Sequence, residues 1–340
     1  MDRARNPVLV ELTRGPLLES LHAGALAVVR PNGAPVLTMG DIERPVYPRS
    51  AVKAFQCLAM VATGAPDRFG FGAAELSLAC ASHSGCEQHV KLAASMLDRA
   101  GLEPGALACG AHEPTDSEAA RALIRQGAAP TALHNNCSGK HAGMLATAIH
   151  MREPVAEYWL PSHPVQRRVA DVLGEFTDLT LAEVAPGVDG CSAPNWPLPL
   201  THLARAFARL GTGEGVAPAL RAKVRRILEA CWAEPEMMAG RGRLDTVLLR
   251  RFPGELFLKT GAEGVYCGVI PDRGLGFALK IDDGAKRASE LAVQALISRL
   301  LPQAADLPIR QVLPNWRGLP VTEIRCSVGF LDELARANSG

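Results

Sequence analysis

The sequence predicts an α+β fold, with an antiparallel sheet built from both chain ends and a mostly helical middle. Two patterns indicate this class: apolar residues alternate near both ends, and between them they recur every three or four positions. Strands on both sides of a helical region are typical of a sheet with helices packed beside it. We expect a single domain over residues 1–340, with the sheet from about 8–45 and 255–301 and the helices from about 50–250.

The first strands are marked by alternation and by a turn. Residues 8–15, VLVELTRG, alternate in polarity, and the apolar runs ALAVVR and PVLTMG flank Asn32-Gly33. An Asn-Gly pair between two apolar runs favours a tight β-hairpin. The chain is therefore expected to open with a hairpin.

Helical spacing starts after Pro48 and continues through the middle of the chain. Apolar residues between Ala51 and Met60 recur at helical intervals, and a proline at the entrance is typical of a helix start. This places Ser50 in the first turn of a helix. From about residue 73 to 235, amphipathic stretches such as HVKLAASMLDRAGL are separated by Gly and Pro turns, which predicts further helices.

Strand-like patterns return at Leu256. The runs LFLKTG, VYCGVI and GFALKI predict strands, and a helix is expected at about 285–301. Residues 303–320 are rich in proline, so we expect a surface connection there. No motif indicates a purpose for residues 303–340.

Composition and charge narrow the classes of partner. The 36 Lys and Arg balance 35 Asp and Glu, and no basic run is interleaved with aromatics, so a nucleic acid is not expected. No segment has the ~20 apolar residues of a membrane span, and the N-terminus lacks the apolar core of an export signal. We expect a cytoplasmic protein with no membrane partner, whose nine cysteines are mostly reduced.

Ser50 and Lys53 form a Ser-x-x-Lys pattern at a predicted helix start. Residues three apart share a helix face, so the amine can reach the hydroxyl, and the helix N-terminus favours negative charge near Ser50. A lysine that acts as a base must be neutral, so its pKa must fall well below the usual value of about 10.4. Burial and a second cation would lower it, and Lys259 is the expected second cation.

Two further motifs support acyl-transfer chemistry. Lys259 begins a Lys-Thr-Gly tripeptide on a predicted strand, and Ser82 lies between the two lysine motifs in chain order. This order is the pattern of penicillin-recognising acyl-transfer enzymes, although Ser-His-Ser stands here in place of Ser-Asp-Asn. Each motif alone is more often a helix start or a strand end, but their order and their predicted elements favour a nucleophile site.

The residue spacing in two polar segments, 134–141 and 187–195, does not by itself identify a catalytic or metal site. Cys137 and Cys191 could supply two thiolates to a metal, but no Cys-x-x-Cys pattern is present. A helix cap and a loop with small buried cysteines explain the segments as well. His83 and His141 flank the chemical motifs, so they are candidates for the site.

Five segments together resemble the rhizobial-type L-asparaginases, the asparaginase II family. They follow the family's order and cover nearly the whole chain, and the central block is the most specific of them. The segments are YPRSAVK at 47–53, ASHSG at 81–85, HNNCSGKH at 134–141, GVDGC at 187–191 and KTGAEG at 259–264.

The resemblance implies a fold like that of serine β-lactamases and glutaminases, a homodimer, and hydrolysis of L-asparagine to L-aspartate and ammonia. It implies two catalytic pairs, Ser50 with Lys53 and Ser82 with Lys259. Ser50 is our first choice as nucleophile because it occupies the helix start, and attack by Ser82 stays open.

The resemblance also implies a zinc ion near the site, held by Cys137, Lys140 and Cys191. Lysine must be neutral to bind a metal, and the part that zinc plays in turnover stays open.

Four residues are expected to bind the substrate. Charge complementarity assigns the α-carboxylate to Arg49 and the α-amino group to Asp189. His83 and Glu263 belong to the resembling segments and are assigned to the same subsite.

Three alternatives remain. Glutamine differs from asparagine by one methylene, so a glutaminase is close in chemistry. A β-lactamase-like hydrolase shares the first and last motifs but would need export. From another class, a zinc-binding or redox protein would use Cys137 and Cys191 and leave the serines idle.

Overall fold

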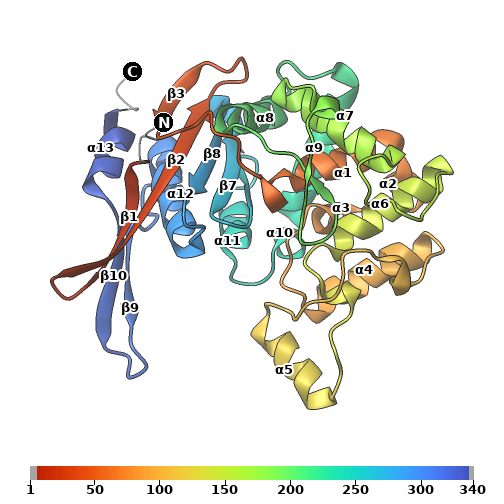
Figure 1. Cartoon of the computed structure of the whole chain (residues 1–340), viewed down its shortest axis with the longest axis horizontal. Helices are drawn as coiled ribbons and strands as arrows, with labels where there is room; N and C mark the ends of the chain where they lie inside the picture. Colours follow the sequence, from red (N-terminus) through yellow and green to blue (C-terminus); the bar gives the residue numbers. More distant parts are fainter. Residues whose placement is uncertain (1–5, 337–340) are drawn as a thin grey trace. The chain divides into compact units, whose positions relative to one another are not determined.

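The computed structural model describes residues 6–336, and the chain divides into two compact units (Figure 1). The sheet unit contains Leu198–Thr212 together with both ends of the chain, up to Val46 and from Thr260 onward. The helical unit contains Tyr47–Pro197 and Gly213–Lys259. The assignment of residues 1–340 to a single domain stays a prediction.

The main sheet joins the two ends of the chain. Its strands are β1 (Val8–Arg14), β2 (Leu17–Val29), β3 (Pro35–Met39), β6 (Phe257–Thr260), β7 (Val265–Ile270), β8 (Leu275–Ile281), β9 (Arg310–Pro314) and β10 (Pro320–Cys326). The order is β6-β7-β8-β2-β1-β10-β9, with β3 paired to β2, and the pairings from β7 to β9 are antiparallel. The predicted antiparallel sheet from both chain ends is therefore confirmed. Strand β6 carries the chain from the helical unit into the sheet unit.

The predicted turn at Asn32-Gly33 is also confirmed. It joins β2 to β3, and the Gly33 N–H donates to the carbonyl of Arg30 at 2.9 Å. Gly33 has φ +89°, a left-handed conformation that glycine adopts without steric cost. The local sequence signal was therefore sufficient to define this hairpin.

The expected surface connection at 303–320 is wrong in part. Strand β9 and the start of β10 form a hairpin there, and β10 pairs with β1 so that Val10 lies opposite Cys326. The prolines do not prevent this, because Pro314 ends β9 and Pro320 begins β10, where a missing N–H costs little. In Figure 1 the blue β9–β10 pair lies beside red β1.

Three helices belong to the sheet unit: α8 (Leu200–Thr212), α12 (Lys286–Leu300) and α13 (Val328–Arg336). Helix α8 packs closely on β8, since a Cβ at Gly276 would lie 2.1 Å from the carbonyl oxygen of Ala204. Glycine is therefore required at this contact. The sequence pattern placed α8 with the other helices of the middle, whereas the structure places it in the sheet unit.

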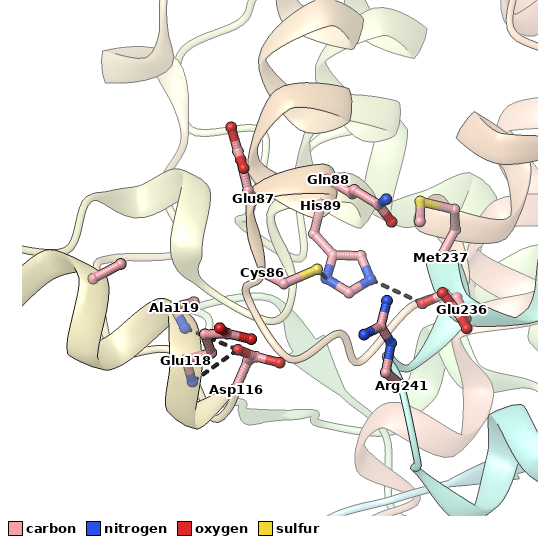
Figure 2. Close-up of a pocket in the computed structure, with 12 residues that line it drawn as sticks. Cys86, Glu87, Gln88, His89, Asp116, Glu118, Ala119, Glu236, Met237 and Arg241 are labelled. Carbon is pink, nitrogen blue, oxygen red and sulfur yellow. Dashed lines mark hydrogen bonds between the residues drawn. The ribbon is translucent and has the colours of Figure 1, made fainter.

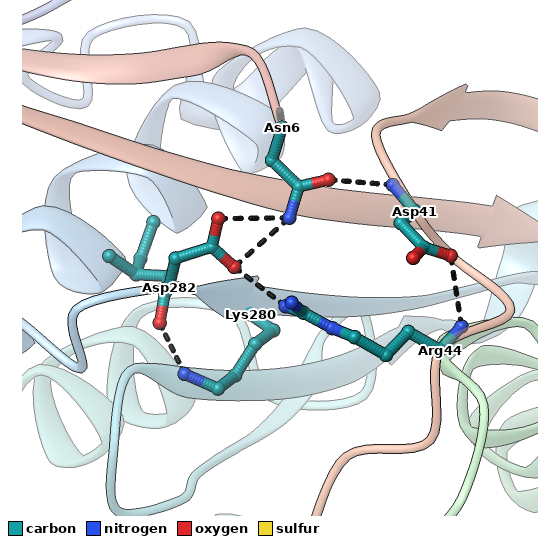
Figure 3. A network of polar contacts seen from close by, with 6 residues as sticks. Asn6, Asp41, Arg44, Lys280 and Asp282 are labelled. Atoms are coloured by element: carbon teal, nitrogen blue, oxygen red, sulfur yellow. Dashed lines mark hydrogen bonds and ion pairs between the residues drawn. The ribbon is translucent and has the colours of Figure 1, made fainter. Parts of the chain in front are cut away.

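A polar network ties the segment after β3 to the end of β8 (Figure 3). The Asn6 amide donates to both carboxylate oxygens of Asp282 at 3.0 Å, and its oxygen accepts from the Asp41 N–H at 2.7 Å. Arg44 donates to Asp282 at 2.7 Å. These bonds fix the chain shortly before it enters the helical unit.

The helical unit is built around α1. Its helices are α1 (Lys53–Thr63), α2 (Ala65–Arg68), α3 (Ala73–Ala79), α4 (Glu87–Arg99), α5 (Ser117–Gln126), α6 (Ser138–Met151), α7 (Pro164–Thr177), α9 (Pro218–Ala233), α10 (Pro235–Met238) and α11 (Leu244–Arg251), with short strands β4 (Gly187–Val188) and β5 (Pro194–Asn195). Helix α1 is buried from Lys53 to Val61 and contacts α6, α7 and α9. A helix buried on all sides is a core element, which confirms the predicted helical middle.

Among residues 6–336, no helix combines the length and the hydrophobicity that a bilayer span requires.

Candidate active site

Ser50 lies where the chain enters α1. It is the second residue of a 3₁₀ turn, Arg49–Val52, that leads directly into the helix, so the predicted place of Ser50 in a first helical turn is confirmed. Arg49 has φ +53°, an uncommon conformation for a residue with a side chain. Such strain is frequent at functional sites and is held by the surrounding structure. Ser50 itself is only 9% exposed.

Lys53 begins α1 and is 1% exposed. Its Nζ donates to the carbonyl oxygen of Ala81, and also to that of Asn136 at 3.4 Å. The amine of the first motif therefore reaches the residue immediately before Ser82. The sequence prediction that these two motifs converge agrees with this contact.

Lys259 is fully buried on β6, the strand predicted for the Lys-Thr-Gly motif. Burial lowers the pKa of Lys259 to about 8; Asp245 opposes this shift, and the positive charge of Lys53 adds to it. About one-tenth of the Lys259 side chains are then neutral at pH 7. The positive charge of Lys53 therefore acts on Lys259, whose pKa falls. The expected effect of Lys259 on Lys53 stays a prediction.

His83 is held on both ring nitrogens by the protein. The Gly85 N–H donates to Nδ1 at 3.1 Å, so Nε2 carries the hydrogen and donates to Ser138 Oγ at 2.9 Å. Burial also lowers the pKa of His83 well below its usual value, which keeps the ring neutral. These contacts fix the backbone beside Ser82, whereas direct binding of the substrate by His83 stays a prediction.

Arg49 and Asp189 pair with each other. Arg49 Nε lies 2.5 Å from Asp189 Oδ1, and both side chains are mostly buried. The β4–β5 turn positions the carboxylate, since the Asp189 N–H donates to the carbonyl of Ala193 at 2.9 Å. The two residues assigned to the substrate's charged groups are therefore adjacent, and each balances the other's charge in this structure.

Cys137, Lys140 and Cys191 also converge, and all three are buried. Lys140 Nζ lies 2.9 Å from Cys191 Sγ. A hydrogen bond from Cys137 lowers the pKa of Cys191, burial opposes this, and the charge of Lys140 lowers it further. Burial alone would lower the pKa of Lys140, but the charge of the Cys191 thiolate overcomes it and raises that pKa.

These three side chains fit a zinc ion in ligand type, because two sulfurs and one nitrogen are donors that zinc prefers. Among residues 6–336, no group of three or more His, Cys, Asp and Glu side chains is arranged to hold a metal, so any site here depends on the Lys140 amine. Lys140 must lose its proton to bind. In this structure Lys140 and Cys191 form an ammonium–thiolate contact.

His141 and Tyr158 support this cluster, and the sequence analysis missed Tyr158. The Ala108 N–H donates to Tyr158 Oη at 2.9 Å, and the same oxygen shares a hydrogen bond with His141 Nδ1, 2.6 Å away. Where the tyrosine is the donor of this second bond, His141 Nε2 carries the ring hydrogen and is not a metal ligand. Tyr158 lies 17 residues from His141 in a turn with no motif of its own, so no local signal indicated it.

Glu263 belongs to the sheet unit. It is exposed in the turn between β6 and β7, with φ +57°. Its assignment to substrate binding stays a prediction.

A family model described as L-asparaginase II matches residues 10–326. A solved β-lactamase from Mycobacterium bovis is 14% identical with a TM-score of 0.41, covering 81% of this chain and 94% of its own. A D-alanine carboxypeptidase from Burkholderia cenocepacia is 14% identical with a TM-score of 0.37, covering 79% and 91%. No curated protein matches the sequence.

Proposed function

Because the chain belongs to the L-asparaginase II family, we propose that it hydrolyses L-asparagine to L-aspartate and ammonia through a serine–lysine acyl-enzyme. One observation carries the proposal: Lys53 of the first motif contacts the carbonyl beside Ser82, and its charge acts on Lys259 of the last motif. Motifs that are far apart in the chain thus share one buried region of the helical unit.

The first step is attack by Ser50 on the side-chain amide carbon. A neutral lysine amine has two N–H groups and one lone pair. When Lys53 has given up its proton to act as the base, the carbonyls of Ala81 and Asn136 can accept its two N–H groups, which would leave its lone pair for the Ser50 hydroxyl. As the C–O bond forms, Lys53 takes the hydroxyl proton and then gives it to the leaving ammonia as the C–N bond breaks.

The second step returns the enzyme to its starting state. Water attacks the β-aspartyl ester, its proton passes to an amine, and L-aspartate leaves as the Ser50 oxygen regains a hydrogen. We assign Ser82 and Lys259 to this proton transfer, because Lys259 exchanges a proton readily near its pKa of about 8.

The Arg49–Asp189 ion pair suits a zwitterionic substrate. Free L-asparagine carries one α-carboxylate and one α-ammonium group, so Arg49 can take the first and Asp189 the second without leaving a buried charge unpaired. A substrate without both charges would have to leave the original ion pair intact. This favours a free amino acid over a lactam.

Cys137, Lys140 and Cys191 are the residues that would hold a zinc ion. When bound, the ion would supply a fixed positive charge that holds Cys191 in place. Cys191 lies two residues after Asp189, so its side chain positions the turn that carries Asp189. Asp189 is the proposed partner of the substrate's α-ammonium group. The homodimer and the cytoplasmic location are proposed from family membership alone.

Ammonia release tests the proposal. We would incubate the protein with L-asparagine, L-glutamine and a β-aspartyl dipeptide, with and without a chelator, and with a chromogenic β-lactam in parallel. Asparagine is expected to be the best substrate, with glutamine weaker because of its extra methylene. Lactam hydrolysis without ammonia release would favour the β-lactamase-like alternative, and no turnover of any substrate would favour a zinc-binding or redox protein.

A further inference from the structure

A pocket lies in the helical unit, lined by none of the residues assigned above (Figure 2). It has a volume of about 410 Å³ and lies at the start of α4, beside the start of α5, α10 and the residues after α10. Its wall includes Cys86, His89, Glu236 and Arg241. The proposed reaction uses none of these side chains, so their arrangement needs its own explanation.

Cys86 differs from every other cysteine of the chain. All nine cysteines are free, eight of them are buried, and Cys86 alone is partly exposed. It is the N-cap residue of α4, a helix of 13 residues. The positive end of a helix dipole stabilises a thiolate, which is the reactive form of cysteine.

His89 is oriented to accept the thiol proton. Its Nε2 lies 2.8 Å from the carbonyl oxygen of Glu236, which can only accept, so Nε2 carries the ring hydrogen. The lone pair of Nδ1 therefore faces Cys86 Sγ, 3.1 Å away (Figure 2). The ring is further held by stacking on His83, with centroids 4.7 Å apart.

The protonation state of His89 suits its role as the acceptor of the thiol proton. Burial lowers the pKa of His89, so the ring is neutral at pH 7 and its lone pair is available. This is the arrangement expected of an activated cysteine: the Cys86 thiol, the His89 base with a fixed tautomer, and the Glu236 carbonyl that fixes the base.

We propose that Cys86 and His89 form a nucleophilic thiol–imidazole pair, and that the pocket is a modification site for small disulfides. The thiol proton passes to His89 Nδ1, and Cys86 Sγ attacks one sulfur of the disulfide. A new S–S bond forms as the old one breaks, and the other half leaves as a thiolate that takes the proton from the imidazolium. Cys86 is oxidised and the leaving sulfur is reduced, so no other oxidant is needed.

The test uses the full-length protein and cystamine, a small disulfide that the pocket can admit. We would follow the reaction by intact-protein mass spectrometry and locate the adduct by peptide mapping, with a free peptide of residues 82–92 as the reference thiol. Cys86 is expected to carry the single adduct and to react at least about tenfold faster than the peptide. Asparagine is absent from this assay, so its result is independent of the proposed hydrolysis.

Three variants sharpen the result. Cys86→Ser should take up no cystamine, and His89→Gln should lower the rate to that of the peptide. Ser95→Ala, which changes an exposed residue of α4 outside the pocket, should keep the wild-type rate. A rate equal to that of the peptide in the wild-type protein, or adducts spread over the other cysteines, would overturn the proposal even if His89→Gln does not fold.

Discussion

The pKa values of two buried lysines of the helical unit are shifted in opposite directions. Burial and the charge of Lys53 bring the pKa of Lys259 down to about 8, while the thiolate of Cys191 raises the pKa of Lys140 despite its burial. Both amines are at least nine-tenths buried, so burial alone does not explain the difference. For Lys259 burial outweighs the opposing charge of Asp245, whereas for Lys140 the Cys191 thiolate outweighs burial, and this balance decides whether a buried lysine can act as a base or serves as a fixed cation.

The largest effect should come from replacing Ser50, the proposed nucleophile. Ser50→Ala should reduce asparagine turnover at least about a thousandfold while the protein stays folded, because it removes the nucleophile and a single oxygen atom. Steady-state ammonia release and circular dichroism check this. Ser95→Ala, at an exposed position of α4, is the matched control. Near wild-type turnover by Ser50→Ala would show that Ser82 or another group attacks.

Replacing each of the two lysines should change the stability of the protein by a different amount. Lys140→Met removes one partner of a buried charged pair and should lower the free energy of unfolding by about 3 kcal/mol. Lys259→Met removes an amine that burial makes costly to charge, which offsets the lost attraction to Asp245, so it should abolish turnover with a smaller loss of stability than Lys140→Met. Urea unfolding measures both, with Lys91→Met on the surface as the control. Equal destabilisation by the two buried substitutions would contradict the comparison.

The stability of the protein should depend on pH through Lys259. The Lys259 side chain keeps its proton up to about pH 10.5 in the unfolded protein, whereas in the folded protein it loses the proton near pH 8. Between these values the unfolded state binds more protons, so stability rises with pH, by up to about 3 kcal/mol. The difference in unfolding free energy between wild type and Lys259→Met should therefore change over pH 8 to 10.5. A constant difference would mean that the amine is not shifted.

Turnover should rise with pH in the same range. The neutral fraction of Lys259 increases about tenfold between pH 7 and pH 9 if its pKa is about 8. Initial rates at saturating asparagine should follow this increase and level off above pH 9. A rate that is flat between pH 7 and 9 would assign the proton transfer to another group.

The sequence predicted the elements that depend on local signals. The hairpin at Asn32-Gly33, the helix start at Ser50 and the strand at Lys259 each have turn or periodicity signals within a few residues, and each is present. Their convergence could be inferred only from motif order. The structure replaces that inference with contacts such as Lys53 to Ala81.

Other features depend on contacts across long stretches of chain. Strand β10 forms against β1, more than 300 residues earlier, and neither segment shows this in its own pattern. The Arg49–Asp189 ion pair spans 140 residues and links two side chains that sequence reasoning assigned separately to the substrate. Tertiary contacts of this kind cannot be read from local periodicity.

The most direct test of the central claim is the pKa of Lys259, measured by NMR of protein with isotope-labelled lysine and assigned by its loss in Lys259→Met. We predict a titration midpoint near 8 that moves upward in Lys53→Met, because the repelling charge is gone. A midpoint near 10.5 that is the same in both proteins would contradict the account.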